Sequence, residues 1–271
     1  MHTARNLTIF QPMYAASYLM NYFMHLIGSL SGRVNNAFID DFRHNILNNK
    51  TEHPEFIFIE QYRSSIYKCE TRDEFKDLGA GTRSFLKRRT IGNAAKSASV
   101  NPKYGRLLFH LARHYQPDMI VELGTAVGIG TMYLACGNPK ARVITVEGNP
   151  QYAEIASGNF VLNSMHNIII INSTFDTAIS RLLPEITKNT LFFIDGNHTL
   201  KATRQYFEVF GKIPESSGIL VFDDINWSPE MSQAWKSIIL SEDSGVAVDL
   251  FQMGILFQGR ERQGQVFHFM Y

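Results

Sequence analysis

The segment "DMIVELGTAVGIGT", residues 118–131, contains a short apolar run that leads directly into a turn with three glycines. Similar apolar runs return later in the chain, at 142–147, 167–172, 190–195 and 218–224. Runs that are apolar at nearly every position are typical of parallel strands buried on both faces. The stretches between them have the apolar spacing of helices. This alternation predicts an α/β fold, with helices on both faces of a doubly wound, mostly parallel sheet.

The C-terminal part of the chain has a different pattern. Residues 246–258 and 265–271 are strand-like apolar runs with only "GRERQG" between them. Two strands joined by so short a connection must be antiparallel neighbours. We therefore expect a Rossmann-like sheet of seven strands, in which five parallel strands are followed by an antiparallel C-terminal hairpin.

Two glycine-rich segments compete for the role of cofactor turn. In the first, "EFKDLGAGTR" at 74–83, the preceding residues "KCETRDEFK" are too charged for a central strand. The second, at 122–130, has a buried strand before it and a helix after it, and ligands of such sheets bind beyond the carboxyl ends of the strands. In this turn the backbone can approach a ligand at Gly124, Gly128 and Gly130.

The glycine spacing and two nearby acids indicate which cofactor the turn accepts. The order G-x-x-x-G-x-G differs from the G-x-G-x-x-G fingerprint of dinucleotide sites. Glu122 can take up an ammonium group while backbone groups of Gly124 and Thr125 meet a carboxylate, whereas a pyrophosphate is poorly served beside this acid. Glu147 ends the next strand, where its carboxylate can accept both ribose hydroxyls. The alternative role for Glu147 is to cap the helix that begins at 149–150.

Acidic side chains gather at the ends of the last two parallel strands. Asp195 and His198 follow the fourth strand, and the pair Asp223 and Asp224 follows the fifth. Three carboxylates in one place raise one another's pKa unless a cation neutralises them. A magnesium ion would do so, and would also orient a hydroxyl group whose proton His198 accepts. The alternative is structural, with Asp223 capping a loop, Asp224 solvated and His198 bonded to a backbone carbonyl.

Residues 101–224 resemble the class I methyltransferases that depend on S-adenosylmethionine (SAM), specifically their catechol-O-methyltransferase-like branch. The similarity lies in "NPKYGRLLFHLARHYQPDMIVELGTAVGIGT", which starts at position 101, and in "INSTFDTAISRLLPEI" at 171–186. The antiparallel ending of the expected sheet is also how these enzymes end. Ser173 stands where the family usually has glycine.

This resemblance implies a set of residues that bind SAM. Phe175 and Asp176 would flank the adenine and hydrogen-bond to it. The complete set that the resemblance and the strand-end acids imply is Glu122, Gly124, Thr125, Gly128, Gly130, Thr131, Glu147, Phe175, Asp176 and Asp195.

The acid cluster is similar to that of the macrolide-sugar O-methyltransferases, which carry an Asp-x-x-His segment and a later Asp-Asp. The similarity implies that Asp195, Asp223 and Asp224 hold magnesium and that His198, beside Asp195, is the catalytic base. We therefore expect a SAM-dependent methyltransferase that O-methylates a hydroxyl of a small molecule or sugar with the help of a metal ion. Two alternatives stay open: a nicotinamide-dependent oxidoreductase on a Rossmann-like sheet, and a non-catalytic SAM-binding protein.

The beginning of the chain lacks the alternating pattern, and helical apolar spacing is found at 39–49 and 53–69. We expect residues 1–95 to form a helical extension that serves as a lid or an oligomer contact. Residues 96–271 are expected to form the SAM-binding methyltransferase domain.

The apolar run at 18–30 is too short to cross a bilayer and is interrupted by Asn21 and His25. We expect it to be a packing helix or the contact of a homodimer. The alternatives are a substrate lid and contact with a membrane surface.

The glycine-rich loop at 77–83 is a candidate gate over the cofactor and acceptor sites. Gly79 and Gly81 would be its hinges, and Arg83 or Lys87 would reach an anionic group. A surface linker between the helical region and the sheet is the alternative.

The net charge and the cysteines of the chain argue against several kinds of partner and site. The formal net charge is +1, with 19% charged residues, which gives no electrostatic reason to expect nucleic acid or an anionic membrane. The two cysteines, Cys69 and Cys136, are far apart and outside any CxxC pattern, which argues against a disulfide framework and against a zinc site. With no basic segment before the apolar run and no clear cleavage site, we expect a cytoplasmic protein.

Overall fold

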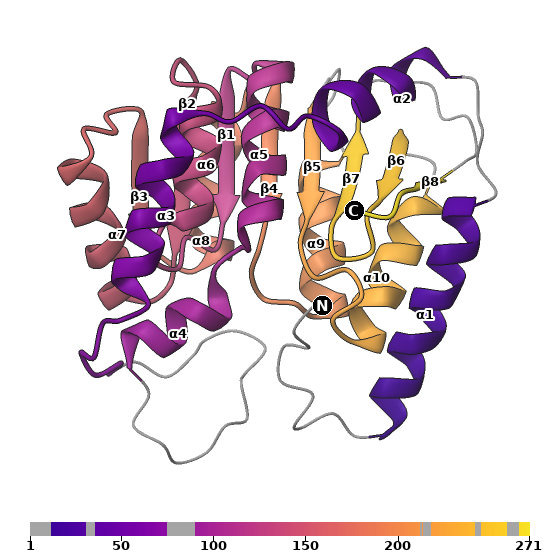
Figure 1. The fold of residues 1–271 in the computed structure, drawn as a ribbon, viewed down its shortest axis with the longest axis horizontal. Helices are drawn as coiled ribbons and strands as arrows, with labels where there is room; N and C mark the ends of the chain where they lie inside the picture. Colours follow the sequence, from indigo (N-terminus) through magenta and orange to yellow (C-terminus); the bar gives the residue numbers. More distant parts are fainter. Residues whose placement is uncertain are drawn as a thin grey trace.

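Eight strands form one mixed sheet, and helices pack against both of its faces (Figure 1). The computed structural model describes residues 12–30, 36–74, 90–211, 213, 218–241, 245–258 and 266–271. The strands are β1 Met119–Leu123, β2 Arg142–Glu147, β3 Ile168–Asn172, β4 Thr190–Ile194, β5 Ile219–Phe222, β6 Val246–Asp249, β7 Gly254–Phe257 and β8 Val266–His268. They lie in the order β3-β2-β1-β4-β5-β7-β6-β8.

The first five strands all pair in parallel, which confirms the predicted α/β sheet. Every residue of β1, β4 and β5 is buried, as expected for strands covered on both faces. The strand order reverses at β1, which lies between β2 and β4. Leu123 at the end of β1 is level with Val146 of β2 and Ile194 of β4. In sheets of this kind, ligands bind beyond the carboxyl ends of the strands at the reversal point.

The C-terminal hairpin is present, but its strands differ from the prediction. Residues 246–258 are two strands, because β6 and β7 pair with each other in an antiparallel hairpin. β8 runs parallel to β6, so the expected antiparallel pairing of 246–258 with 265–271 is wrong, and the sheet has eight strands, not seven. The chain reverses because the Asp249 carboxylate accepts the backbone N–H of Phe251 at 2.8 Å, and Phe251 adopts a φ of 67°.

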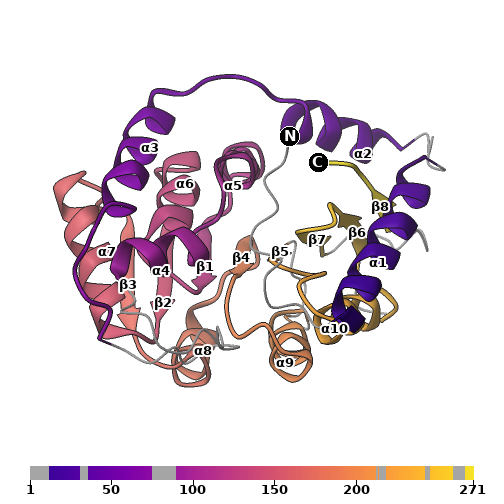
Figure 2. The same ribbon diagram turned by 60° about the horizontal axis from the view of Figure 1, so that its bottom comes forward.

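The helices form two layers. Their bounds are α1 Pro12–Leu30, α2 Ala37–Phe42, the π-helical turn η2 Arg43–Leu47, α3 Pro54–Ile66, α4 Ile91–Ala98, α5 Pro102–Tyr115, α6 Ile129–Gly137, α7 Pro150–Leu162, α8 Phe175–Leu182, the 3₁₀ turn η3 Leu183–Glu185, α9 Leu200–Phe210 and α10 Pro229–Ile239. Figure 2 shows α8, α9 and α10 on one side of the sheet and α3, α5 and α6 on the other. Each layer has its own buried cluster of apolar side chains.

The predicted helical stretches at 39–49 and 53–69 form α2 with η2 and α3, and they join the core of the sheet. Phe42 and Phe56 belong to the same apolar cluster as the helices α5 and α6. The ring of Phe56 meets that of Phe109 edge to face, with centroids 4.8 Å apart. Tyr133 of α6 donates its hydroxyl proton to Glu60 of α3 at 2.6 Å. These contacts fix α3 beside the helix that follows the cofactor turn.

α1 packs against β8 and α10, at the β8 edge of the sheet (Figure 2). Asn21 donates to the Ser232 hydroxyl of α10 at 2.8 Å, and His25 is buried. The outer face is apolar; its most exposed large side chains are Leu19, Met20, Phe23, Met24 and Leu30. Among the described helices, none has the length and hydrophobicity that a membrane-spanning segment needs.

Candidate active site

The turn after β1 requires glycine at two positions. Gly124 has a φ of 108°, and a Cβ atom there would lie 2.1 Å from the carbonyl oxygen of Asp195. Gly128 has a φ of 89°, and its Cβ would lie 2.7 Å from the Phe160 ring. Both angles are in the left-handed region that favours glycine. The turn therefore passes closely over the end of β4 before α6 begins.

Some backbone N–H groups near this turn are hydrogen-bonded within the sheet, and others lie at the start of α6. Those of Gly124 and Thr125 both donate to the carbonyl oxygen of Val146, at 3.0 and 3.3 Å, and are engaged within the sheet. α6 starts with Gly128 as its N-cap, which has no side chain to satisfy the N–H groups of the first turn. An uncapped helix N-terminus attracts an anion. A carboxylate is therefore better placed at the first turn of α6 than at Gly124 and Thr125, where the sequence prediction put it.

Glu122 is buried beneath the first turn of α6, with only 1% of its surface exposed. One carboxylate oxygen accepts the hydroxyl protons of Thr131 and of Thr145, the latter at 2.6 Å. Burial raises the pKa of Glu122 to about 8; the two hydroxyl donors oppose this effect, and the charges of Asp195 and Glu147 add to it. A cationic group at this carboxyl would lower its pKa again, so the site favours an ammonium group.

Glu147 ends β2 on the same edge of the sheet. Its two carboxylate oxygens accept the backbone N–H groups of Ala126 and Asn149, each at 2.8 Å. Asn149 itself caps α7. Both predicted roles are therefore compatible with the geometry: Glu147 helps to cap the following helix and is held rigidly beside the cofactor turn. A carboxylate oxygen can accept more than one hydrogen bond, so this anchoring leaves the acid able to receive hydroxyl groups.

Phe175 and Asp176 begin α8, which Thr174 caps. The Phe175 ring packs over Gly196, where a Cβ would lie 2.7 Å from the ring, and is edge to face with Tyr206. This contact joins the start of α8 to the end of β4. Asp176 is exposed, and its carboxylate accepts a hydrogen bond from Gln205 at 3.4 Å.

The predicted acids meet at the ends of β4 and β5. Backbone hydrogen bonds bring them level: the N–H of Asp195 donates to Leu123 at 2.9 Å, and that of Asp223 donates to Ile194 at 3.0 Å. His198 Nε2 lies 3.5 Å from Asp195 Oδ1. Asp223 is 5% exposed and accepts the backbone N–H of its neighbour, Asp224, at 2.9 Å.

The charged groups of this cluster shift one another's pKa values. Burial raises the pKa of Asp223 well above its ordinary value, and the charges of Asp224 and Asp195 raise it further. Burial acts to lower the pKa of His198, but the hydrogen bond to Asp195 and the surrounding acids outweigh it and raise the pKa to about 9. The acids around His198 therefore favour its protonated form in this arrangement.

The chemistry of the three acids fits magnesium, which prefers oxygen ligands, and the charges of Asp224 and Asp195 raise the pKa of Asp223 beyond the effect of its burial. Their positions fit it less closely. In the part of the chain that the structure describes, Asp195, Asp223 and Asp224 do not form a group whose ligand atoms all lie within 4.8 Å of one another. A magnesium ion bound by all three acids therefore requires side-chain movement.

Two residues that sequence reasoning missed contribute to the site. Thr145 lies opposite Glu122 in the sheet and donates to it, but a threonine inside the apolar run "VITVE" carries no signal of that role. Tyr62 of α3 donates its hydroxyl proton to the carbonyl oxygen of Val127 in the cofactor turn, at 2.8 Å. A contact across so much of the chain cannot be found from local spacing. The candidate gate at 77–83, with Gly79, Gly81, Arg83 and Lys87, lies outside the described residues.

Known proteins are similar to the part of the chain that contains this site. Residues 121–225 match a family model described as a methyltransferase domain. A catechol O-methyltransferase from Niastella koreensis is 29% identical over 133 residues, which cover 47% of this chain and 58% of that protein. The chain thus spans less than two thirds of the length of this relative.

Solved structures share the fold at low sequence identity. An O-methyltransferase from Bacillus cereus in complex with SAH has a TM-score of 0.54 and 17% identity, over 82% of this chain and 97% of that one. An SAH-bound methyltransferase from Podospora anserina has a TM-score of 0.57 and 13% identity, over 84% and 97%. Residues 121–225 are thus similar to a methyltransferase domain, part of the chain is similar to a catechol O-methyltransferase, and the chain shares the fold of solved SAH-bound methyltransferases.

Proposed function

We propose that this protein is a SAM-dependent O-methyltransferase whose acceptor is a hydroxyl group of a small molecule or sugar. The observation that carries the proposal is the buried carboxyl of Glu122 beneath a glycine turn and an uncapped helix N-terminus. An acid beside an anion-binding helix end is complementary to the ammonium and carboxylate of a methionine moiety. Neither the acidic group of Glu122 nor the glycine spacing suits a pyrophosphate, so a nicotinamide cofactor is not favoured.

We propose specific roles for the remaining cofactor residues. Glu147, anchored by two backbone N–H groups, would accept the ribose hydroxyls. Phe175 would pack against the adenine, and the exposed carboxylate of Asp176 would hydrogen-bond to it. The residues proposed to line the rest of the SAM site are Gly124, Thr125, Gly128, Gly130, Thr131 and Asp195.

Methyl transfer is an in-line displacement, so the protein must align the acceptor oxygen and remove its proton. We propose that Asp195, Asp223 and Asp224 hold a magnesium ion, which would supply the positive charge that orients a hydroxyl group and lowers its pKa. A cation among these acids would lower the pKa of His198, which they now raise to about 9. His198 would then be free of its proton and able to act as the base.

The reaction is tested by measuring release of S-adenosylhomocysteine from SAM across a panel of hydroxylated acceptors, with magnesium or with a chelator. We expect turnover with at least one acceptor and its loss in chelator. Asp223→Asn should abolish the magnesium-stimulated rate and leave SAM affinity within about twofold, because Asp223 belongs to the metal set and not to the cofactor turn. Equal turnover in magnesium and in chelator would refute the metal and leave the methyltransferase proposal standing.

We propose that the helical extension, residues 1–95, completes the cofactor site. The Tyr62 hydrogen bond to Val127 and the Tyr133 hydrogen bond to Glu60 hold α3 against the turn and against α6. We place its boundary with the methyltransferase domain, residues 96–271, within α4 and just before α5, the helix that leads into β1. Both cysteines are unpaired, which supports a reducing, cytosolic location.

We also propose that a second copy of the chain covers the outer face of α1. Leu19, Phe23 and Leu30 expose 65%, 59% and 79% of their surface. α1 has no lysine, arginine, aspartate or glutamate in its sequence, whereas helices that lie on a membrane surface usually carry basic residues on a polar face. An uncharged apolar face of this kind fits the self-complementary contact of a homodimer better than a lipid surface.

A further inference from the structure

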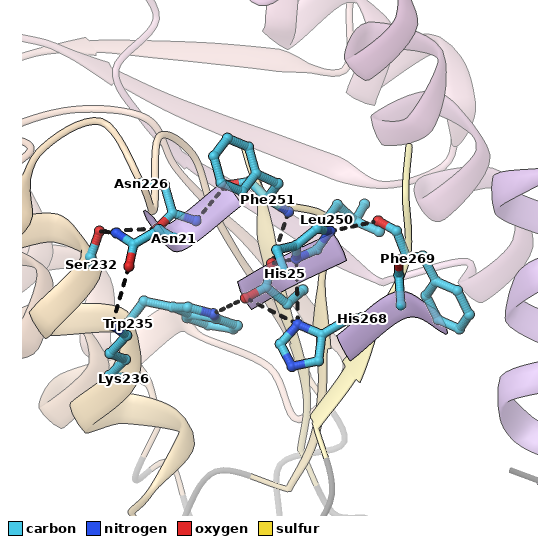
Figure 3. A network of polar contacts seen from close by, with 12 residues as sticks. Asn21, His25, Asn226, Ser232, Trp235, Lys236, Leu250, Phe251, His268 and Phe269 are labelled. Atoms are coloured by element: carbon cyan, nitrogen blue, oxygen red, sulfur yellow. Dashed lines mark hydrogen bonds and ion pairs between the residues drawn. The ribbon is translucent and has the colours of Figure 1, made fainter. Parts of the chain in front are cut away.

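His25, Asp249 and His268 meet beside β6 and β8, at the end of the sheet where α1 packs. Figure 3 shows the rings of His25 and His268 close together. His25 comes from α1, Asp249 ends β6 and His268 ends β8. In the described part of the chain, this is the group of potential metal ligands whose ligand atoms all lie within 4.8 Å of one another. The set contains two imidazoles and one carboxylate, and the proposed methyl-transfer site uses none of them.

The contacts within this cluster, which involve both carboxylate oxygens of Asp249, are close to the spacing of ligands around one metal ion. His25 Nδ1 lies 3.0 Å from Asp249 Oδ1 and 3.4 Å from His268 Nδ1, and His268 Nδ1 lies 3.7 Å from Asp249 Oδ2. Zinc with bonds of about 2.0–2.2 Å separates its tetrahedral ligands by roughly 3.3–3.6 Å. The two contacts of His268 are long for hydrogen bonds, so hydrogen bonding alone does not account for its position.

His25 and Asp249 have further hydrogen-bond partners, as the ligands of metal sites do. His25 Nε2 donates to the carbonyl oxygen of Phe269 at 3.1 Å, and since a carbonyl only accepts, the proton of a neutral ring is on Nε2 and the lone pair is on Nδ1. That lone pair faces Asp249 and His268. Asp249 in turn accepts the indole N–H of Trp235 at 2.9 Å and the backbone N–H of Phe251 at 2.8 Å. Such partners orient metal-binding histidines and carboxylates.

α1 has a glycine, Gly28, at the position where it packs against the His268 ring. A Cβ atom on Gly28, one turn after His25, would lie 2.8 Å from the His268 ring. A glycine inside a helix weakens it. Here the glycine lets the ring approach the helix backbone, so that its Nδ1 meets the His25 ring.

We propose that His25, Asp249 and His268 bind a zinc ion that fastens α1 to the last two strands, with a water molecule as the fourth ligand. Two imidazoles and a carboxylate are a zinc-type ligand set, whereas magnesium prefers oxygen ligands alone. The rarity of cysteine argued against zinc at the level of sequence. That argument covers cysteine sites only, and these ligands come from opposite ends of the chain. Without a metal, the 3.0 Å contact would be a direct one between His25 Nδ1 and Asp249 Oδ1.

The test uses the full chain, stripped with a chelator and then dialysed against zinc in the presence of excess magnesium, which occupies oxygen-only sites. The zinc content is measured by mass spectrometry after desalting. We expect about one zinc per chain in the wild type, in the exposed-histidine control His166→Gln and in Asp223→Asn. His268→Gln should weaken zinc binding more than tenfold, and Trp235→Phe about tenfold, because it removes an outer partner of Asp249.

Two further readouts keep the test independent of folding defects. Cobalt substituted for zinc should give the intense visible absorption of a tetrahedral site in the wild type and not in His268→Gln. Zinc should raise the Tm of the wild type and not that of His268→Gln, whose side chain is 29% exposed and therefore tolerates substitution. Equal zinc content in the wild type and His268→Gln would overturn the proposal, and so would loss of zinc in Asp223→Asn alone, which would place the ion at the catalytic acids.

Discussion

At the scale of single residues, Glu122 connects the local chemistry to the proposed cofactor. Its carboxyl group is buried, so the folded protein holds a proton up to a pKa of about 8, whereas its ordinary pKa is 4.5. The unfolded chain releases that proton at lower pH. The raised pKa of Glu122 therefore does not lower the free energy of unfolding below about pH 4.5. Between pH 4.5 and 8 it lowers the free energy of unfolding of the unliganded protein increasingly.

We expect Glu122→Gln to stabilise the protein in the absence of cofactor. The amide oxygen can accept the hydroxyl protons of Thr131 and Thr145, and no charge has to be buried. The free energy of unfolding should rise by about 1–3 kcal/mol at pH 8 and change little at pH 5. Urea denaturation at the two pH values measures this difference. A variant that is less stable than the wild type at pH 8 would show that the charged carboxylate is well solvated in the fold.

A second residue-scale prediction concerns the cofactor turn. Gly124→Ala should cost about 2 kcal/mol or more, because a Cβ would lie 2.1 Å from the carbonyl oxygen of Asp195 at a φ of 108°. Gly158 is the matched control: it lies in α7, and a Cβ there would meet no atom within 4 Å. Gly158→Ala should stabilise the protein by about 0.5–1 kcal/mol. Thermal melts of the two variants compare these effects; a neutral Gly124→Ala would contradict the turn geometry.

At the scale of elements, α1 reverses the usual arrangement of an amphipathic helix. Asn21 and His25, which interrupt its apolar sequence, face the protein and bond to α10 and to the last strands. Large apolar side chains face outward. A helix on the surface of a monomer normally buries its apolar stripe. The reversed arrangement is what makes the outer face of α1 an interface candidate.

We expect Phe23→Glu to shift the protein from dimer to monomer at micromolar concentration, since it places a charge in the centre of that face. Phe23 is 59% exposed, so the monomer should stay folded. The matched control is Leu162→Glu on α7, where an 86% exposed apolar residue lies outside the proposed contact. Light scattering after size exclusion gives the mass of each variant. A wild type that is monomeric at high concentration would refute the homodimer.

The elements show which kinds of information the sequence contains. Five parallel strands were predictable because each is a continuous apolar run bounded by polar residues, and the acids at their ends could be placed at one edge of the sheet. The β6–β7 turn was not, because it depends on the Asp249 side chain accepting a backbone N–H inside an otherwise apolar stretch. The pairing of His25 with His268 joins residues 243 positions apart and has no local signal.

At the scale of the whole molecule, the two proposed sites lie on different strands of the sheet. The reversal between β1 and β4 brings the glycine turn, Glu147 and the acids of β4 and β5 to one edge, where a cofactor and an acceptor can meet. β5 and β7 lie between β4 and β6, the strand that carries Asp249. The proposed zinc clamp can therefore fasten α1 without taking part in methyl transfer.

The most direct test of the central claim is calorimetric titration of the full chain with SAM and, separately, with NAD. We expect SAM to bind at one site per chain, NAD to give no measurable heat, and Glu122→Gln to weaken SAM at least tenfold by removing the charge opposite its ammonium group. Because the pKa of Glu122 is about 8 before binding, SAM should also release up to one proton at pH 7, seen as a dependence of the heat on the buffer. Binding of NAD without binding of SAM would contradict the account.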